Sequence, residues 1–342
     1  YDIPVYVGNI IRYVDLKLIV ATGAIIAIVS GPLSAEEKTP LGELAETIKN
    51  IAQGVEQGNG KAAATHEVIS TAVSVANSAL NDVEDKILSN SNFTHFELSL
   101  GSDTLGLDTG KSDTKSEAMT VYGLKETNNW FMFNQTAVVN FNDRTTVNTG
   151  FGARYINETD TIIVGANVFY DYEMQSKHKR SGVGLELFSS IFELRANQYK
   201  AASKTLTYKN INETALDGSD VKLTSNLPYF FSSSIYGTLQ KWKDGVSHNT
   251  EHYEAGFNAE IVRNLTLNLA AQHKNGSGNT ETVGSLIYSI PLGRVKQPAK
   301  EMQDGVWTTK FKPIREKLYK PVQRENRVMK KAIKLGVTVS GY

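Results

Sequence analysis

Residues 252–261 read HYEAGFNAEI and alternate strictly between two kinds of side chain. One face carries Tyr253, Phe257 and Ile261 with alanines between them, while the other face is polar and includes Glu254. Successive side chains of a β-strand point to opposite faces of the sheet. The stretch therefore predicts a strand with one apolar face and one polar face.

The same alternation recurs along the chain, next in NLTLNLAAQ at residues 264–272. A soluble sheet alternates in the same way, so the number, length and arrangement of the segments decide the interpretation. We expect twelve strands, at residues 93–100, 117–126, 130–141, 145–156, 161–172, 180–189, 191–201, 220–227, 229–241, 252–261, 264–273 and 282–291.

The connections between these segments alternate between short turns and longer loops, with Asn142–Asp143 as a tight turn where a longer loop is due. Outer-membrane barrels have short turns on one side and long loops on the other. An even number of strands also lets the sheet close without an edge exposed to lipid. The prediction is an all-β fold, a twelve-stranded antiparallel transmembrane β-barrel over residues 92–292.

The amino-acid composition is compatible with a barrel but does not by itself identify the class of protein. The 342 residues hold 36 Lys+Arg, 36 Asp+Glu and no cysteine, so net charge points to no particular partner. No stretch reaches the ~20 apolar residues that a spanning helix needs. A barrel strand shows lipid only every second residue, so a mean hydropathy of -0.28 is compatible with a barrel.

The N-terminal part differs in kind. A short apolar run at residues 18–29 follows Arg12 and Lys17 and precedes small residues, which is typical of a signal peptide cleaved after Ala35. The alternative is a buried helix or a retained anchor. Because the chain begins with Tyr, its true start is expected upstream, within a leader that ends at residue 35.

Residues 36–91 are rich in alanine and carry helical spacing, with one apolar stripe between Ile69 and Ile87. We expect a helical segment there that packs on a neighbouring part of the protein, the barrel end being the simplest choice. A dimerisation helix is the alternative.

The polar faces of the predicted strands carry many ionisable groups. A basic side chain facing lipid at mid-depth costs about 2–4 kcal/mol, and an acidic one less. These groups are therefore expected to face the lumen or one another. They are Glu97, Arg154, Asp171, Glu186, Glu193, Arg195, Glu254 and Glu260.

Beyond residue 292 the alternation ends, and residues 293–334 hold thirteen Lys/Arg against four Asp/Glu, a net charge of +9. A basic run is usually a solvated tail or a nucleic-acid patch. A third interpretation places residues 293–342 as a linker inside the pore, where the predicted lumen acids would pair with it. Its basic residues include Lys310, Lys312, Arg315, Lys317, Arg324 and Arg327.

Two blocks resemble a known family, GANVFYDY at residues 165–172 and VQREN at residues 322–326. They are similar to the translocator of the intimin/invasin family, the inverse autotransporters, and the similarity runs over residues 92–334. The resemblance implies a twelve-stranded barrel in the bacterial outer membrane with a periplasmic N-terminus, so that the helical segment 36–91 would be periplasmic. It also implies that residues 293–334 pass through the pore and carry a C-terminal passenger to the cell surface.

The resemblance also implies partners: the outer-membrane lipid bilayer, periplasmic chaperones and the barrel assembly machinery. A host or neighbouring-cell receptor would be reached only through a passenger, and no immunoglobulin-like repeats follow before Tyr342. No nucleic-acid partner is expected.

The sequence predicts no catalytic residue, cofactor or metal site. His248 and His252 are four residues apart but span a loop and a strand start rather than one helix face. No G-x-S-x-G elbow is present. Three functions remain open: a secretion translocator that anchors an adhesion-type passenger, an outer-membrane diffusion channel, and an outer-membrane enzyme, which the missing motifs disfavour.

Overall fold

The computed structural model describes residues 92–103, 113–141, 144–227, 233–243, 249–262, 264–275, 280–292 and 312–333. The predicted leader with its cleavage at Ala35 and the predicted helical segment 36–91 lie outside these residues.

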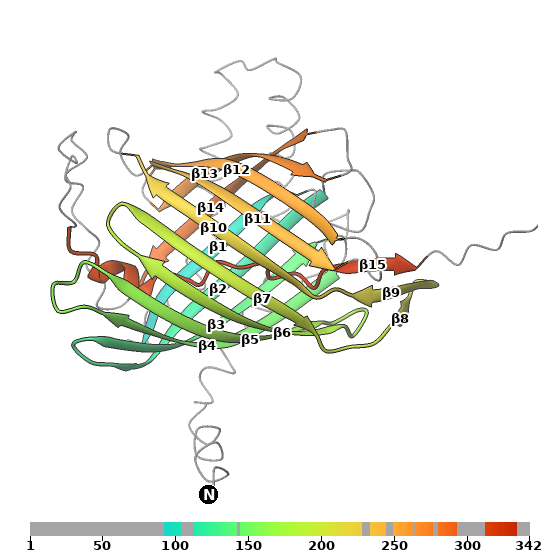
Figure 1. Ribbon diagram of the computed structural model, residues 1–342, viewed down its shortest axis with the longest axis horizontal. Coiled ribbons are helices and arrows are strands. Elements are labelled where there is room, and N and C mark those ends of the chain that lie inside the picture. The colour runs from blue at the N-terminus through green and yellow to red at the C-terminus, as the bar shows by residue number, and fades with distance from the viewer. Residues whose placement is uncertain are drawn as a thin grey trace, which may run out of the picture.

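Twelve antiparallel strands form one closed barrel, as the alternation predicted (Figure 1). Each strand pairs with its two neighbours, so backbone groups are satisfied all around the ring, as a membrane interior requires. The ring order is β1-β14-β13-β12-β11-β10-β7-β6-β5-β4-β3-β2. The strands are β1 (Phe93–Asp103), β2 (Asp113–Glu126), β3 (Trp130–Phe141), β4 (Arg144–Ile156), β5 (Ile163–Glu173), β6 (Lys179–Phe188), β7 (Phe192–Ala201), β10 (Gly218–Asn226), β11 (Ser233–Lys243), β12 (Asn249–Val262), β13 (Leu265–Lys274) and β14 (Thr280–Pro291).

The first and last strands close the ring. β1 pairs antiparallel with β14 from His95 opposite Pro291 to Gly101 opposite Ser285. β1 and β2 both extend beyond their predicted limits, β1 as far as Asp103 and β2 from Asp113 onward.

The two faces of a strand differ in burial, as β6 illustrates. Val183 and Leu185 point outward and are 56% and 66% exposed, whereas Arg180 and Glu186 point inward and are buried. An apolar exterior over a polar interior is the arrangement of a barrel that faces lipid.

A second, three-stranded sheet stands at the end of the barrel that carries the longer connections, here called the loop end. It has the order β15-β9-β8 and consists of β8 (Leu206–Tyr208), β9 (Ile211–Ala215) and β15 (Lys330–Ile333). Residues 202–219 connect two of the predicted strands and were expected to form a loop; that expectation was wrong, because 206–208 and 211–215 are strands. Lys209 and Asn210 both have positive φ, 47° and 62°, as a two-residue hairpin turn requires.

The segment 312–333 begins beside the short connections, here called the turn end of the barrel. There Ile314 donates its N–H to the Asp160 carbonyl at 2.7 Å, and the 3₁₀ helix η2 (Arg315–Tyr319) follows. The rest of the segment is extended and ends in β15 at the loop end (Figure 1). Its apolar side chains join a buried cluster with strand residues, made of Val121, Phe131, Phe133, Ile156, Ile163, Phe169, Phe188, Ile314, Leu318 and Val322.

Within the described ranges, no helix has the length and apolar character needed to cross a membrane.

Candidate functional site in the barrel interior

Asp171, near the loop end of β5, is the centre of the first charged cluster. Its carboxylate accepts two hydrogen bonds from Arg324 at 2.7 and 2.8 Å and one from the Arg180 Nε at 2.7 Å. Asn148 donates a fourth, at 2.7 Å. All these side chains are buried, and such good geometry is what allows a buried ion pair to offset the cost of desolvation.

A glycine makes room for this cluster. A Cβ on Gly182 of β6 would lie only 2.9 Å from the Arg324 Nη2. The missing side chain therefore lets the guanidinium lie against the wall, where it also stacks 4.4 Å from the centre of the Phe169 ring.

Arg154 of β4 forms the second cluster and is fully buried. It pairs with Glu186 through two hydrogen bonds of 2.8 and 3.0 Å. Its remaining nitrogen donates to the carbonyls of Leu318 and Lys320, at 2.7 and 2.5 Å. Those carbonyls lie at the C-terminal end of η2, where a helix leaves acceptors without partners. Arg154 thus joins the wall to the segment.

Glu193 of β7 holds the third cluster. It accepts from Arg195 at 2.9 Å, and it pairs with Lys317 at 2.9 Å and Lys320 at 2.8 Å. The Lys317 ammonium also donates to the Ser189 carbonyl at 2.8 Å. Two basic residues of the segment therefore converge on one buried wall carboxylate.

The backbone of the segment is also held by wall side chains. Gln135 of β3 both donates to the Val322 carbonyl at 3.0 Å and accepts its N–H at 2.7 Å. Asn148 donates to the Asn326 carbonyl at 2.8 Å, and the Tyr199 hydroxyl accepts the Glu325 N–H at 2.8 Å. An extended chain without sheet neighbours needs such partners when it is buried.

The predicted linker residues occupy different positions. Lys317 and Arg324 lie in the clusters just described. Arg315 is at the turn end, where it pairs with Asp160 at 2.7 Å, and Lys312 is exposed there, with its backbone N–H on the Ser190 hydroxyl at 3.2 Å. Arg327 pairs with Glu325 of its own segment at 2.8 Å, and Lys310 lies outside the described residues.

A network at the loop end joins the barrel, the hairpin and β15. Arg144 binds Glu213 of β9 through bonds of 2.6 and 3.0 Å and Glu173 of β5 at 2.8 Å. Lys330 of β15 pairs with Glu173 as well. Burial lowers the pKa of the Lys330 ammonium to about 8, although Glu173 beside it favours the charged form.

Several of these partners were missed from sequence, although some carried a readable signal. Arg180 shares the period-two phase of Glu186, and Asn148 shares that of Arg154, so extending the phase along each strand would have included them. Lys320 and Lys330 carry no such signal, because the segment that contains them does not alternate.

Two interior faces can be compared directly. The β6 face consists of the inward side chains of β6, and every one is buried: Arg180, Gly182, Gly184, Glu186 and Phe188. The β12 face consists of the inward side chains of β12, and every one is half-buried: His252, Glu254, Gly256, Asn258 and Glu260.

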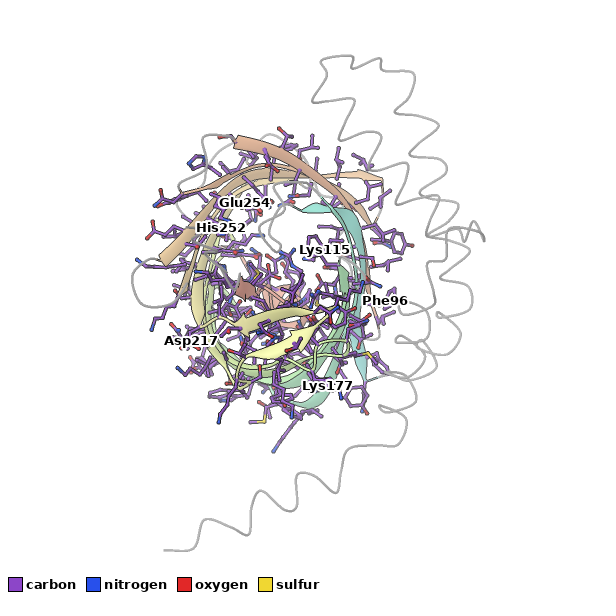
Figure 2. The ribbon with its side chains drawn as sticks, turned by 90° about the vertical axis from the view of Figure 1, so that its right-hand side faces the viewer. Phe96, Lys115, Lys177, Asp217, His252 and Glu254 are labelled. Carbon is purple, nitrogen blue, oxygen red and sulfur yellow. The ribbon has the colours of Figure 1, made fainter. Side chains whose placement is uncertain are left out.

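The remaining predicted lumen residues lie on or near the β12 face. Glu254 accepts a 2.5 Å bond from Gln272, and Glu260 accepts the Asn264 N–H at 2.9 Å. Glu97 of β1 accepts a 2.9 Å bond from Ser289. Figure 2 looks along the barrel and labels Glu254 and His252 on this side. The segment's hydrogen bonds given above go instead to β3–β7, to the turns beside them and, through β15, to β9.

In the part of the chain that the structure describes, no three His, Asp or Glu side chains are grouped to hold a metal ion. His248 lies outside that part.

Several known proteins resemble the chain over part of its length. It is 32% identical over 127 residues to a putative attaching and effacing protein homolog of Escherichia coli (strain K12), covering 36% of this chain and 43% of that protein. It is 28% identical over 207 residues to the inverse autotransporter adhesin YeeJ of the same strain, covering 57% and 9%. It is 28% identical over 102 residues to the invasin of Yersinia enterocolitica, covering 29% and 12%. The chain thus spans less than half of each relative.

A solved structure described as "Unveiling the Mechanism Behind the in-meso Crystallization of Membrane Proteins" has a similar fold. The TM-score is 0.57 at 18% identity, and the match covers 70% of this chain and 100% of the other.

The family model for the inverse autotransporter beta-domain matches residues 45–326. Together with the closed barrel and its apolar exterior, the match places the protein in the bacterial outer membrane, and the family is one of adhesion and secretion barrels, not a family of enzymes. The chain belongs to the inverse autotransporter β-domain family.

Proposed function

We propose that this barrel anchors and exports a passenger joined to its C-terminal end. In this proposal the N-terminus is periplasmic, and residues 293–342 form a linker that passes through the lumen toward the cell surface. The basic residues of the linker, among them Lys317 and Arg324, pair with the lumen acids Glu193 and Asp171.

One observation carries the proposal: the segment 312–333 makes partners along the whole length of the barrel wall. It starts on Asp160 at the turn end, continues past Arg154 and Gln135, and ends as β15 on β9 at the loop end. A segment held in this way can continue into the chain on either side of the membrane, before residue 312 at the turn end and beyond residue 333 at the loop end.

The orientation follows from the connections. Short turns of outer-membrane barrels face the periplasm, and longer loops face the outside. Residue 312 is at the turn end and residue 333 at the loop end, so the chain beyond 333 emerges on the outer side in this proposal.

Epitope tags on intact cells test the orientation. A tag placed after Tyr342 should bind antibody without permeabilisation, and a tag placed after Ala35 should bind only once the outer membrane is opened. Both tags should be present in equal amounts in lysates. The opposite labelling pattern would reject the orientation.

The proposed partners follow from this role. The exterior contacts the lipid bilayer, and insertion uses periplasmic chaperones and the barrel assembly machinery. A host or neighbouring-cell receptor would be bound by the passenger rather than by the barrel. The basic residues of the segment pair with wall acids, which argues against a nucleic-acid partner.

A diffusion channel without a passenger is the second candidate, because the β12 face is half-buried. Single-channel conductance separates the two candidates. If the segment is a linker that fills part of the lumen, a variant ending at Leu292 should conduct much more than the full chain. Equal conductance would favour a permanently open channel.

A further inference from the structure

The half-buried β12 face runs through most of the depth of the membrane. His252 and Glu260 are eight residues apart, which is about 26 Å along a strand. Barrel strands are tilted by about 35–45°, so this length spans about 20 Å of an apolar band that is about 25 Å tall. Every inward side chain over this distance is in contact with solvent, whereas every inward side chain of β6 is buried.

This side carries a polar network beside a small buried cluster of Tyr236, Ala270 and Val283. Asn268 of β13 donates to the Asn258 side chain at 2.8 Å and to the Tyr236 hydroxyl at 2.9 Å, and Asn258 donates to the Ser234 hydroxyl at 3.2 Å. Amide and hydroxyl groups that are half-buried can also bind water, so such a wall stays hydrated.

The charges on this side are mostly acidic. Glu254 and Glu260 lie on the β12 face, and Glu97 lies on β1 two strands beyond β13. The basic groups among them include Lys222 of β10, whose ammonium lies 4.0 Å from the centre of the Tyr236 ring, and Lys274 of β13, which is paired with His252 in the sheet. Acidic side chains along a pore favour cations.

The segment leaves this side accessible because its anchors are elsewhere. Arg154, Asp171 and Glu193 draw its basic residues and its backbone toward β4–β7. Displacing it toward β12 would leave these buried charges without partners, which is strongly unfavourable.

We propose that the β12 face bounds a hydrated passage through which small ions, cations preferentially, cross the barrel while the segment 312–333 remains in place. The passage is a second activity of the barrel, separate from the export of a passenger.

The absence of cysteine from the chain permits a direct test. Single cysteines are placed at Asn258 and, as a matched control, at Asn167 of β5, an inward asparagine that is buried. A positively charged, water-soluble thiol reagent should label N258C roughly tenfold or more faster than N167C, since a buried site reacts only on local opening. In planar bilayers the same reaction should remove most of the conductance of full-length N258C.

Charge reversal tests the ion preference. In a potassium chloride gradient, Glu254→Lys should shift the reversal potential of the full chain toward anions. Glu251→Lys on the same strand is the control, because Glu251 lies on the outward-facing side and pairs with Lys241 at 3.0 Å. It should leave the reversal potential unchanged. Heat-shifted gel mobility verifies that each variant has folded.

Equal labelling of N258C and N167C would overturn the passage, as would labelling that leaves the conductance intact or a full chain that conducts nothing. None of these results depends on surface display of a C-terminal tag, which reports on export alone.

Discussion

The β6 face and the β12 face are built from the same kind of strand, with inward polar and outward apolar residues, yet one is fully buried and the other half-buried. The difference arises because the segment 312–333 covers the β6 face and not the β12 face. The wall at and beside β6 carries the carboxylates Asp171, Glu186 and Glu193, and arginines or lysines pair with each of them. Alternation therefore determines which way a side chain points, but long-range charge pairing determines whether the interior is filled.

The largest expected effect compares two glutamates at similar places on these faces. Glu186→Ala removes the partner of the buried Arg154 and should lower the free energy of unfolding by about 3–5 kcal/mol. Glu254→Ala removes a half-buried carboxylate that water can replace and should cost less than about 1 kcal/mol. Urea unfolding in detergent micelles measures both, and equal losses would contradict the contrast.

A second comparison concerns the exteriors, which should not differ. Leu185→Arg on β6 and Phe257→Arg on β12 each place a cation in lipid and should each cost about 2–4 kcal/mol. Asn258→Arg on the inward side of β12 should assemble normally. Heat-shifted gel mobility of membrane fractions gives the result, and normal assembly of the two exterior variants would refute the assignment of the faces.

A smaller effect measures how much the hydrogen bonds from the barrel wall to the segment backbone contribute to stability. Gln135→Leu leaves the Val322 N–H and carbonyl without partners in a buried place and should cost about 1–3 kcal/mol. Asn258→Leu loses bonds that water can replace, so its cost should be clearly smaller. Urea midpoints of the two variants compare them, and a larger loss for Asn258→Leu would reverse the contrast.

The most local effect is a pH dependence of the docking of β15 at the loop end. Between about pH 8 and the ordinary value of 10.5, Lys330 loses its proton when β15 is docked but keeps it when undocked. The undocked state then binds more protons, so burial of the Lys330 ammonium opposes docking less, and docking becomes more favourable, as pH rises through that window.

Lys330→Met tests this dependence. The unfolding temperature of the wild type relative to the variant should shift in favour of the wild type from neutral pH to about pH 10. The exposed Lys241→Met is the matched control and should show no such drift. A shift in the opposite direction would contradict the lowered pKa of Lys330.

Period-two alternation was sufficient to predict the barrel, because strands such as β12 are long enough to repeat the pattern several times. The hairpin of β8 and β9 escaped detection because three to five residues are too few for a period to stand out. The sequence did contain one sign of this hairpin: Tyr208 and Ile211 are apolar residues on either side of the two turn residues Lys209 and Asn210.

The pairing inside the barrel could not be read from sequence. The basic character of residues 293–334 pointed to acidic partners, but nothing in the chain matches Arg324 to Asp171, 153 residues away, rather than to Glu254. Such choices depend on which carboxylates face one another across the closed ring, and only the three-dimensional arrangement contains that information.

The antiparallel ladder between β15 and β9 has a mechanical consequence. A tensile load on the chain beyond residue 333 enters β15 at its outer end, whereas β9 is tethered to β10 at the other end of the ladder, beside Ala215. The load therefore acts in shear, and the four paired positions resist it together instead of tearing apart one after another.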